Sequence, residues 1–205
     1  ASKSRGLGDV YKRQALVRCK NTSYILQMHN KPVTSSPKIT SRMKLFVDQA
    51  LKNKDFWDLC CDHGYIGIHA LQSEKFRCIH FVDQQKHIIE NLKMRFHQSR
   101  NFLKDSYQYE FHAQDARKLS SQITGNLLIA GVGGKLAHDI LGKLIQEEKL
   151  NADRILISIH SEEQKYIHLI SEVLCIYTHK LSLSFQEGKR ERSLEVFDLE
   201  PSQLD

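Results

Sequence analysis

The sequence predicts an α/β protein with a doubly wound, Rossmann-like, mostly parallel seven-stranded sheet and a terminal antiparallel hairpin. Three observations lead to this fold class. Short apolar strands alternate with amphipathic helices along most of the chain. An aspartate follows each of the first three strands. The last two strands, 179–185 and 192–199, are joined only by QEGKRE, which is too short for the crossover helix that parallel neighbours need. Right-handed crossovers then place the five earlier βα units in one sheet.

The first helix is expected from Thr40 to about Leu51, because apolar residues recur there three and four positions apart. Thr40 or Ser41 can cap its N-terminus. The apolar run Phe56–Cys60 predicts the first strand, and Ile66–Gln72 the helix that follows it.

The later elements follow the same alternation. The run 126–132 is continuously apolar, as expected of a strand buried on both faces. Ser161 and Gln164 have the spacing of a capping box, which predicts that a helix opens there. The expected ranges are strand 76–82, helix 86–104, strand 107–113, strand 126–132, helix 133–150, strand 154–159 and helix 161–175.

Length and composition restrict the class of protein. A chain of 205 residues holds one domain, with or without tails. Its net charge of +6 is a mild basic excess, which suits a polyanion such as RNA without requiring one. Five cysteines without disulfide-like spacing are typical of a reducing cytoplasm, so a cytoplasmic location is expected. No apolar run approaches the ~18 residues of a membrane span, so no membrane partner is expected.

The N-terminal stretch has no helical or strand periodicity. Residues 9–14, DVYKRQ, resemble the translated end of a sequencing adapter, so residues 1–14 are interpreted as an adapter-derived tail. A natural basic arm that touches nucleic acid is the alternative. Removing this tail takes away four basic residues and one acid, which leaves a net charge of +3. Residues 15–37 are interpreted as a poorly ordered lead-in, and 38–200 as the functional domain.

Polar residues gather where the first two strands end. In open α/β sheets, ligands bind outside the carboxyl ends of the strands. Asp58, Asp62, His63 and Gly64 would therefore lie beside a nucleotide-like cofactor. Asp83 closes the second strand 21 residues after Asp62, close to the ~20 expected for a ribose-binding acid. The alternatives are an Asx-type turn for the first loop, a structural acid at Asp58 and a helix N-cap at Asp83 and, after the third strand, at Asp115.

The order of elements resembles class I S-adenosylmethionine-dependent methyltransferases, and the loops resemble one family of these, the bacterial tRNA adenine-22 N1-methyltransferases. Four segments carry the resemblance: Thr40–Met43 (TSRM), Asp58–Ile66 (DLCCDHGYI), Ile129–Gly134 (IAGVGG) and Glu187–Lys189 (EGK). Together they span about residues 39–199. The resemblance implies that S-adenosyl-L-methionine is the cofactor and that the methyl acceptor is N1 of an adenine in tRNA.

The resemblance also implies cofactor-binding roles. Asp58, Asp62, His63 and Gly64 would bind the methionine end of the cofactor. The remaining cofactor-binding residues are Asp83 and Gln84 at the ribose, and Asp115 and Ala116 at the adenine. Two departures from the family pattern stand out. Cys60 and Cys61 replace a glycine and its small neighbour, and no counterpart of the family's C-terminal helical hairpin is found before Asp205.

The glycine loop after the fourth strand predicts the type of acceptor. Many amino-group methyltransferases carry an N-P-P-Y loop here, which this chain lacks. Gly131, Gly133 and Gly134 leave space and backbone donors, which suits a ring nitrogen that already has a lone pair and needs only positioning. Tyr65 is expected to stack on a base. The alternatives are a tight turn with positive φ for the glycines and packing on the sheet for Tyr65.

Basic residues near the first helix and the hairpin are candidate RNA contacts: Arg42, Lys189, Arg190 and Arg192. A solvated hairpin tip is the alternative. No metal is expected, because neighbouring residues in the run Cys60–His63 point to opposite faces and no other Cys or His pair has zinc-ligand spacing. Three other functions stay open: methylation of another RNA or a small molecule, a non-catalytic binding module with a decayed site, and a nicotinamide oxidoreductase, which the missing G-x-G-x-x-G disfavours. Oligomeric state is not predicted.

Overall fold

The computed structural model describes residues 39–98, 104 and 106–200. The predicted adapter tail, 1–14, and the predicted lead-in, 15–37, lie outside the described residues. No helix in the described part of the chain is long and apolar enough to cross a membrane.

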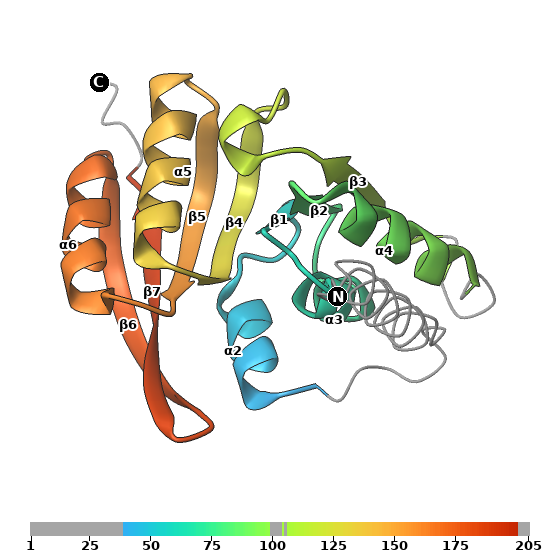
Figure 1. Ribbon diagram of the computed structural model, residues 1–205, viewed down its shortest axis with the longest axis horizontal. Helices are drawn as coiled ribbons and strands as arrows, with labels where there is room; N and C mark the ends of the chain where they lie inside the picture. Colours follow the sequence, from blue (N-terminus) through green and yellow to red (C-terminus); the bar gives the residue numbers. More distant parts are fainter. Residues whose placement is uncertain (1–38, 99–103, 105, 201–205) are drawn as a thin grey trace, which may run out of the picture.

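Seven strands form one sheet in the order β3-β2-β1-β4-β5-β7-β6 (Figure 1). The first five strands pair in parallel, and β7 runs antiparallel to both β5 and β6. The predicted doubly wound, mostly parallel sheet with a terminal hairpin is therefore confirmed. The strands are β1 Phe56–Leu59, β2 Ile79–Asp83, β3 Tyr109–Ala113, β4 Ile123–Val132, β5 Leu150–Ile159, β6 Tyr177–Glu187 and β7 Arg190–Leu199.

Helices cover both faces of the sheet. One apolar cluster joins the sheet to α2, α3 and α4, and a second joins it to α5, α6 and the short 3-10 helix η2. The helices are α2 Ser41–Gln49, α3 Tyr65–Gln72, α4 Lys86–Gln98, η2 Ala116–Lys118, α5 Gly134–Gln146 and α6 Glu163–Val173. The strand order reverses between β1 and β4, and the loops after these two strands therefore meet at one edge.

A buried amide fixes the entry into β1. Asn126 on β4 is fully buried, and its Oδ1 accepts the Leu51 N–H at 2.7 Å. Its Nδ2 donates to the backbone oxygens of Leu51 and Asp55 at 2.9 and 3.1 Å. All three bonds hold the segment between α2 and β1, so they set where β1 begins and where its carboxyl end lies.

The ends of several elements differ from the sequence expectation. β5 begins at Leu150 rather than 154, because Ile123, Thr124 and Gly125 extend β4 and give it pairing partners. The hairpin strands are longer and their turn is shorter than predicted, because β6 extends to Glu187 and β7 begins at Arg190. Gly188 takes a positive φ of 63° in the short turn between them, a conformation that glycine adopts without steric cost.

The two predicted helix starts had different outcomes. Thr40 is the N-cap of α2 as expected, and its Oγ1 accepts the Met43 N–H at 3.2 Å. The predicted capping box of Ser161 and Gln164 is wrong. Glu162 is the N-cap of α6, with φ 51°, and its side chain makes no capping hydrogen bond. The Glu163 carboxylate instead accepts the Ser193 N–H at 2.9 Å. Contact with β7 therefore sets this helix end, in place of a local cap.

Candidate active site

A cavity of about 260 Å³ lies at the carboxyl edge of the sheet, where the strand order reverses. Its walls come from the loops after β1, β2, β3 and β4 and from the helices α4 and α5. Half of the twelve predicted cofactor-binding and catalytic residues line it: Asp62, Asp83, Gln84, Asp115, Ala116 and Gly131. The structure thus brings together residues from four separate strand ends, as expected for this class of sheet.

The loop after β1 has a strained backbone. Cys60, Asp62 and Gly64 all have positive φ values, of 58°, 49° and 67°. Only glycine adopts this region without steric cost, and a left-handed L-residue costs roughly 1–2 kcal/mol. Cys60 therefore holds a glycine-like conformation while its side chain lines the cavity. Burial raises the pKa of this thiol to about 12, so it is protonated at neutral pH.

Asp83 connects the first two loops. It is only 7% exposed, and both carboxylate oxygens accept backbone N–H groups. Oδ2 accepts from Asp62 at 3.2 Å, and Oδ1 accepts from Gln85 at 2.8 Å. The helix N-cap alternative is thus partly realised, since Gln85 directly precedes α4. The same carboxylate also lines the cavity, so holding the loop and facing a ligand are compatible.

Asp115 is the N-cap of η2, which realises the cap alternative, and Arg117 holds it. Oδ1 of Asp115 accepts the backbone N–H and the Nε of Arg117, each at 3.0 Å, and Oδ2 accepts Nη2 at 2.7 Å. These hydrogen bonds with Arg117 hold the pKa of Asp115 below its usual range. The carboxylate therefore stays charged at the cavity wall, and a ligand amino group would share it with the guanidinium.

Asp58 lies away from the cavity walls. It is 3% exposed, and its Oδ2 accepts the Gly67 N–H in the first turn of α3 at 3.0 Å. Burial raises its pKa to about 7, with a smaller contribution from the nearby charge of Asp83. This geometry agrees with the structural-acid alternative, in which Asp58 fixes α3 against β1.

His63 and Gly64 also lie outside the residues that line the cavity. Gly64 is the N-cap of α3 at φ 67°, and a Cβ there would lie 2.8 Å from Leu92 Cδ2. The backbone oxygen of His63 accepts Nη1 of Arg95 at 2.9 Å. Tyr65 is 37% exposed and stacks with the Arg95 guanidinium 5.4 Å from its ring centroid. His63 and Tyr65 are thus exposed on the outer side of the first loop, whereas Gly64 is buried against α4.

The three glycines at and beyond the carboxyl end of β4 have different environments. Gly131 lines the cavity at φ 78°, and a Cβ there would meet only the His160 ring, at 4.0 Å. Gly133 is the N-cap of α5 with φ −71°. Gly134 packs on α6, where a Cβ would lie 2.6 Å from Tyr166. The positive φ expected of a tight turn therefore belongs to Gly131, and Gly134 allows close packing of α5 on α6.

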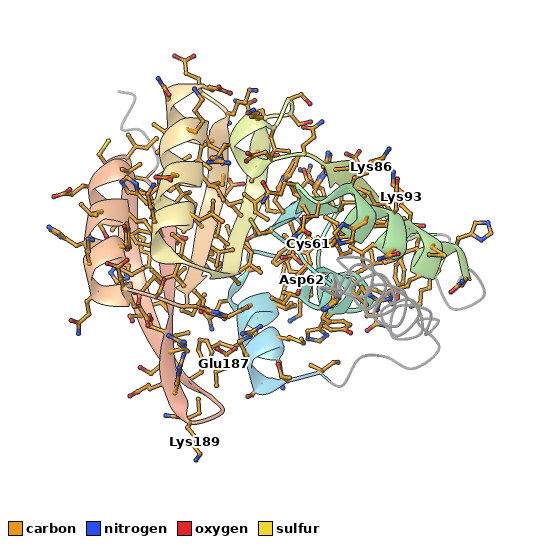
Figure 2. All side chains as sticks on the ribbon, viewed as in Figure 1. Cys61, Asp62, Lys86, Lys93, Glu187 and Lys189 are labelled. Atoms are coloured by element: carbon orange, nitrogen blue, oxygen red, sulfur yellow. The ribbon has the colours of Figure 1, made fainter. Side chains whose placement is uncertain are left out.

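The predicted RNA contacts divide into two pairs. Arg42 on α2 forms an ion pair with Glu187, and Arg192 Nε lies 3.7 Å from the same carboxylate. Arg42 thus joins α2 to the hairpin, whereas Arg192, itself on β7, pairs within the hairpin. Lys189 and Arg190 are exposed, and Lys189 stands at the hairpin tip (Figure 2). Of the four, these two present their charge to solvent.

Sequence reasoning did not select several residues that line the cavity. Gln85 and Gln114 lie within two residues of the predicted Asp83 and Asp115, and this closeness to a strand end is the signal that could have identified them. The apolar wall comes from strand ends and from helix faces that periodicity assigns to the core. It comprises Val82, Ile88, Val132, Leu136 and Ile140.

The charge of the cavity is one-sided. Three carboxylates line it, from Asp62, Asp83 and Asp115. Among the described residues that line it, none is Lys or Arg; the Arg117 guanidinium pairs with Asp115 from the neighbouring surface hollow. A cavity of this charge favours a ligand that carries positive charge and hydroxyl or amino donors.

Comparisons with known proteins agree with this arrangement. Residues 39–183 match the family model described as a methyltransferase domain. Among solved structures, the B. subtilis M1A22 tRNA methyltransferase TrmK is similar (17% identity, 80% of this chain and 67% of that chain covered, TM-score 0.64). M. capricolum TrmK in complex with S-adenosyl-homocysteine is also similar (15% identity, 80% of this chain and 70% of that chain covered, TM-score 0.63). A methyltransferase from Pyrococcus furiosus is similar as well (16% identity, 77% of this chain and 81% of that chain covered, TM-score 0.56). No match is found among curated proteins.

Proposed function

Because the chain belongs to the methyltransferase domain family, we propose that it transfers a methyl group from S-adenosylmethionine to N1 of an adenine in tRNA. The observation that carries the cofactor assignment is the acidic cavity at the point where the strand order reverses. The acceptor assignment is supported by the glycine loop after β4 and by the printed activity of the similar TrmK structures.

The residues of the cavity fit this cofactor. Its sulfonium and amino groups are positive, and its ribose hydroxyls and adenine amino group are donors that carboxylates accept. Asp83, fixed by two backbone N–H groups, is suited to the ribose, with Gln84 beside it. Asp115 and Ala116 are suited to the adenine, and Asp62 to the methionine end. A nicotinamide dinucleotide would bring a diphosphate toward three carboxylates, so its binding is disfavoured.

The acceptor position is the space in front of Gly131. This residue offers no side chain, and the nearest group to a Cβ placed there is the His160 ring at 4.0 Å. A planar base could therefore approach the cavity along this wall. Adenine N1 has an in-plane lone pair, so holding it in line with the methyl group is enough and no base must first remove a proton.

The RNA-binding surface would include the exposed hairpin tip. Lys189 and Arg190 are placed to contact phosphates there, whereas Arg42 and Arg192 are engaged with Glu187 and would position the hairpin. With few phosphate contacts and a modest net charge, tRNA binding should be weak and strongly salt-dependent, because each contact releases counterions. The reaction would take place in the cytoplasm, where tRNA is modified.

The test is a methyl-transfer assay. The protein is incubated at low salt with methyl-labelled S-adenosylmethionine and unmodified tRNA, and the labelled nucleoside is identified after digestion. N1-methyladenosine is expected, and Asp83→Asn should lower its yield while Glu90→Gln, a change on an exposed part of α4, should not. N6-methyladenosine would overturn the ring-nitrogen argument. Label found only in a small molecule or in the protein would overturn the RNA assignment.

A further inference from the structure

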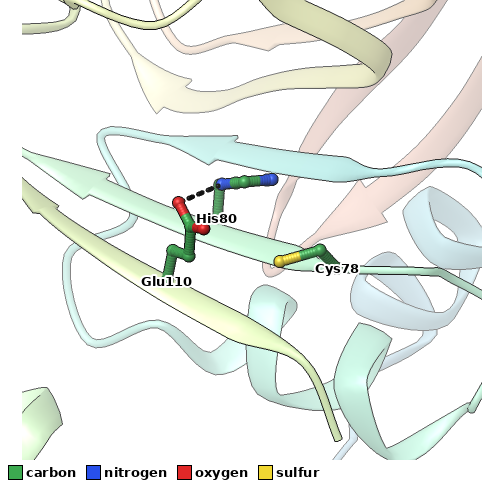
Figure 3. A group of neighbouring side chains, drawn as sticks. All are labelled: Cys78, His80 and Glu110. Carbon is green, nitrogen blue, oxygen red and sulfur yellow. Dashed lines mark ion pairs between the residues drawn. The ribbon is translucent and has the colours of Figure 1, made fainter.

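Four potential metal ligands lie on one face of β2 and β3, away from the cavity walls. Cys78 and His80 are two residues apart at the start of β2, and Glu110 and His112 are two apart on β3. Residues two apart on a strand point to the same face. His80 and Glu110 are register partners, so the two pairs stand side by side, and Figure 3 shows three of these side chains projecting toward one another.

The ligand atoms already form a compact triangle. His80 Nδ1 and His112 Nε2 are 3.2 Å apart, and Glu110 Oε2 lies 3.4 Å from each of them. Around a tetrahedral Zn²⁺ with bonds of ~2.0–2.1 Å, neighbouring ligand atoms lie about 3.3 Å apart. The three distances therefore match one face of such a tetrahedron.

Cys78 lies beside two of these three ligands, His80 and Glu110. Its Sγ and the ligand atoms of His80 and Glu110 all lie within 4.8 Å of one another. Zn–S bonds of ~2.3 Å would bring sulfur to about 3.6 Å from the nitrogen and oxygen ligands. The Cys78 side chain would move by about 1 Å relative to His80 and Glu110, and by more relative to His112. Thiolate, imidazole and carboxylate are each ligands that zinc binds in proteins.

No single pattern of hydrogen bonds makes all three contacts of this triangle at once. At most, each imidazole nitrogen carries one hydrogen, which points along one line in the ring plane. If both nitrogens donate to Glu110, they face each other at 3.2 Å with no bond between them; if one donates to the other, a contact with the carboxylate is left unmade. A cation at the centre accepts a lone pair from all three atoms at once.

The surroundings hold the site in place and leave it open to an ion. The Trp57 ring stacks on His80 with centroids 3.7 Å apart and planes 6° apart, which fixes the imidazole orientation. The His80 side chain is 9% exposed and the Glu110 side chain is 59% exposed, so the ion can enter at the edge of the sheet. β3 is the edge strand, and β2 leads to Asp83 as β3 leads to Asp115.

We propose that Cys78, His80, Glu110 and His112 bind one structural Zn²⁺ that ties the edge strand β3 to β2. The sequence predicts no metal, because the run Cys60–His63 does not have the spacing of a metal site. The four ligands proposed here are instead two pairs of residues, each pair two positions apart, on neighbouring strands. The zinc site is independent of the methyl-transfer proposal, since its ligands lie outside the cavity.

The test measures metal binding directly. Tag-free protein is dialysed against Zn²⁺ alone and its metal content and melting temperature are determined; Co²⁺ is then substituted and its absorption recorded. One ion per chain, a higher melting temperature with Zn²⁺ and a thiolate-to-cobalt absorption band are expected. Cys78→Ser should remove that band, and Cys78→Ser and Glu110→Gln should each lower Zn²⁺ affinity at least about 10-fold, since even loss of groups around the ligands costs that much.

Two matched variants serve as controls. Cys175→Ser changes an exposed cysteine, and Glu172→Gln changes the carboxylate of an exposed His–Glu pair whose atoms are also 3.4 Å apart. Neither should alter Zn²⁺ binding. Less than one bound ion per chain would overturn the proposal. Unchanged affinity in Cys78→Ser or Glu110→Gln, with the fold intact by circular dichroism, would overturn it as well. Cys78 and Glu110 are not fully buried, and both replacements are nearly isosteric. These two variants therefore avoid the unfolding that His80→Ala would risk.

Discussion

The loops after β1 and β4 occupy equivalent places at the carboxyl edge of the sheet, yet the chain builds them differently. At the β4 end the chain reaches a left-handed conformation once, at Gly131, where no side chain resists it. The β1 loop does so at Cys60, Asp62 and Gly64, so two L-residues carry strain there.

Contacts from other elements hold the strained loop. Asp83 accepts the Asp62 N–H, the Cys61 N–H donates to the Val82 oxygen at 3.0 Å, and the buried Asp58 fixes the start of α3. The Gly131 loop needs no such support from carboxylates. Strained backbone persists only where its surroundings determine it, and it gathers at functional sites. The comparison therefore assigns the β1 loop to a preorganised ligand wall and the β4 loop to an open approach.

The largest expected effect separates the two loop glycines. Gly64→Ala should lower the free energy of unfolding by about 2–5 kcal/mol, from left-handed strain of about 1–2 kcal/mol and overpacking against Leu92 of about 1–3 kcal/mol. Gly131→Ala meets nothing closer than 4.0 Å and should cost only the strain. Urea denaturation of both variants measures the difference. Equal losses would remove the contrast between a packed loop and an open one.

The next effect concerns the carboxylate that holds the strained loop. Asp83→Asn removes a charged acceptor from the cavity and should weaken S-adenosylmethionine binding by about 1.5–3 kcal/mol, or roughly 10- to 100-fold. Isothermal titration calorimetry measures the dissociation constant, with Glu90→Gln as a charge-matched control on exposed α4. An unchanged dissociation constant in a folded Asp83→Asn protein would show that Asp83 does not bind the cofactor and only holds the β1 loop.

A third effect depends on pH. Burial raises the pKa of Asp58 to about 7, above its value of about 3.9 in an unfolded chain. The folded protein thus binds this proton more tightly, and its stabilising contribution, complete below about pH 4, is lost as the pH rises to 7. The free energy of unfolding should fall by up to about 1.4 kcal/mol per pH unit in that window.

Asp58→Asn should flatten this slope, because an amide does not titrate. The amide oxygen can still accept the Gly67 N–H, so the fold is kept. Urea denaturation at pH 5, 6, 7 and 8 measures the slope in both proteins. Asp153→Asn, at a surface ion pair with Lys54, is the control and should keep the slope of the parent. A parallel pH profile in Asp58→Asn would show that this carboxyl is ionised in the folded protein.

The fold could be predicted from sequence because its signals are local. Apolar runs, amphipathic periodicity and a short final connection are enough to specify the sheet and its hairpin. The division of roles among the site residues could not be predicted in this way. Asp58 and Asp62 are close in sequence, but Asp58 lies on the strand face that packs on α3, whereas Asp62 lies beyond the strand end at the cavity. Likewise, Glu187 engages Arg42, 145 positions away, a pairing that no local pattern encodes.

The smallest effect tests whether strain in the β1 loop has a ligand-related cost. Cys60→Gly relieves a left-handed L-residue, a gain of about 1–2 kcal/mol. Against this stands the greater freedom of glycine in the unfolded chain, about 0.5–1 kcal/mol, together with the lost burial of the thiol. The free energy of unfolding should therefore change by less than about 1 kcal/mol.

The cavity wall recedes where the side chain was, so S-adenosylmethionine should bind more tightly. Cys61→Ala, at a buried neighbour outside the cavity walls, is the control and should leave the dissociation constant unchanged. Weaker binding in Cys60→Gly would show that the thiol itself contacts the ligand, and the β1 loop would then owe its strain to a specific side chain.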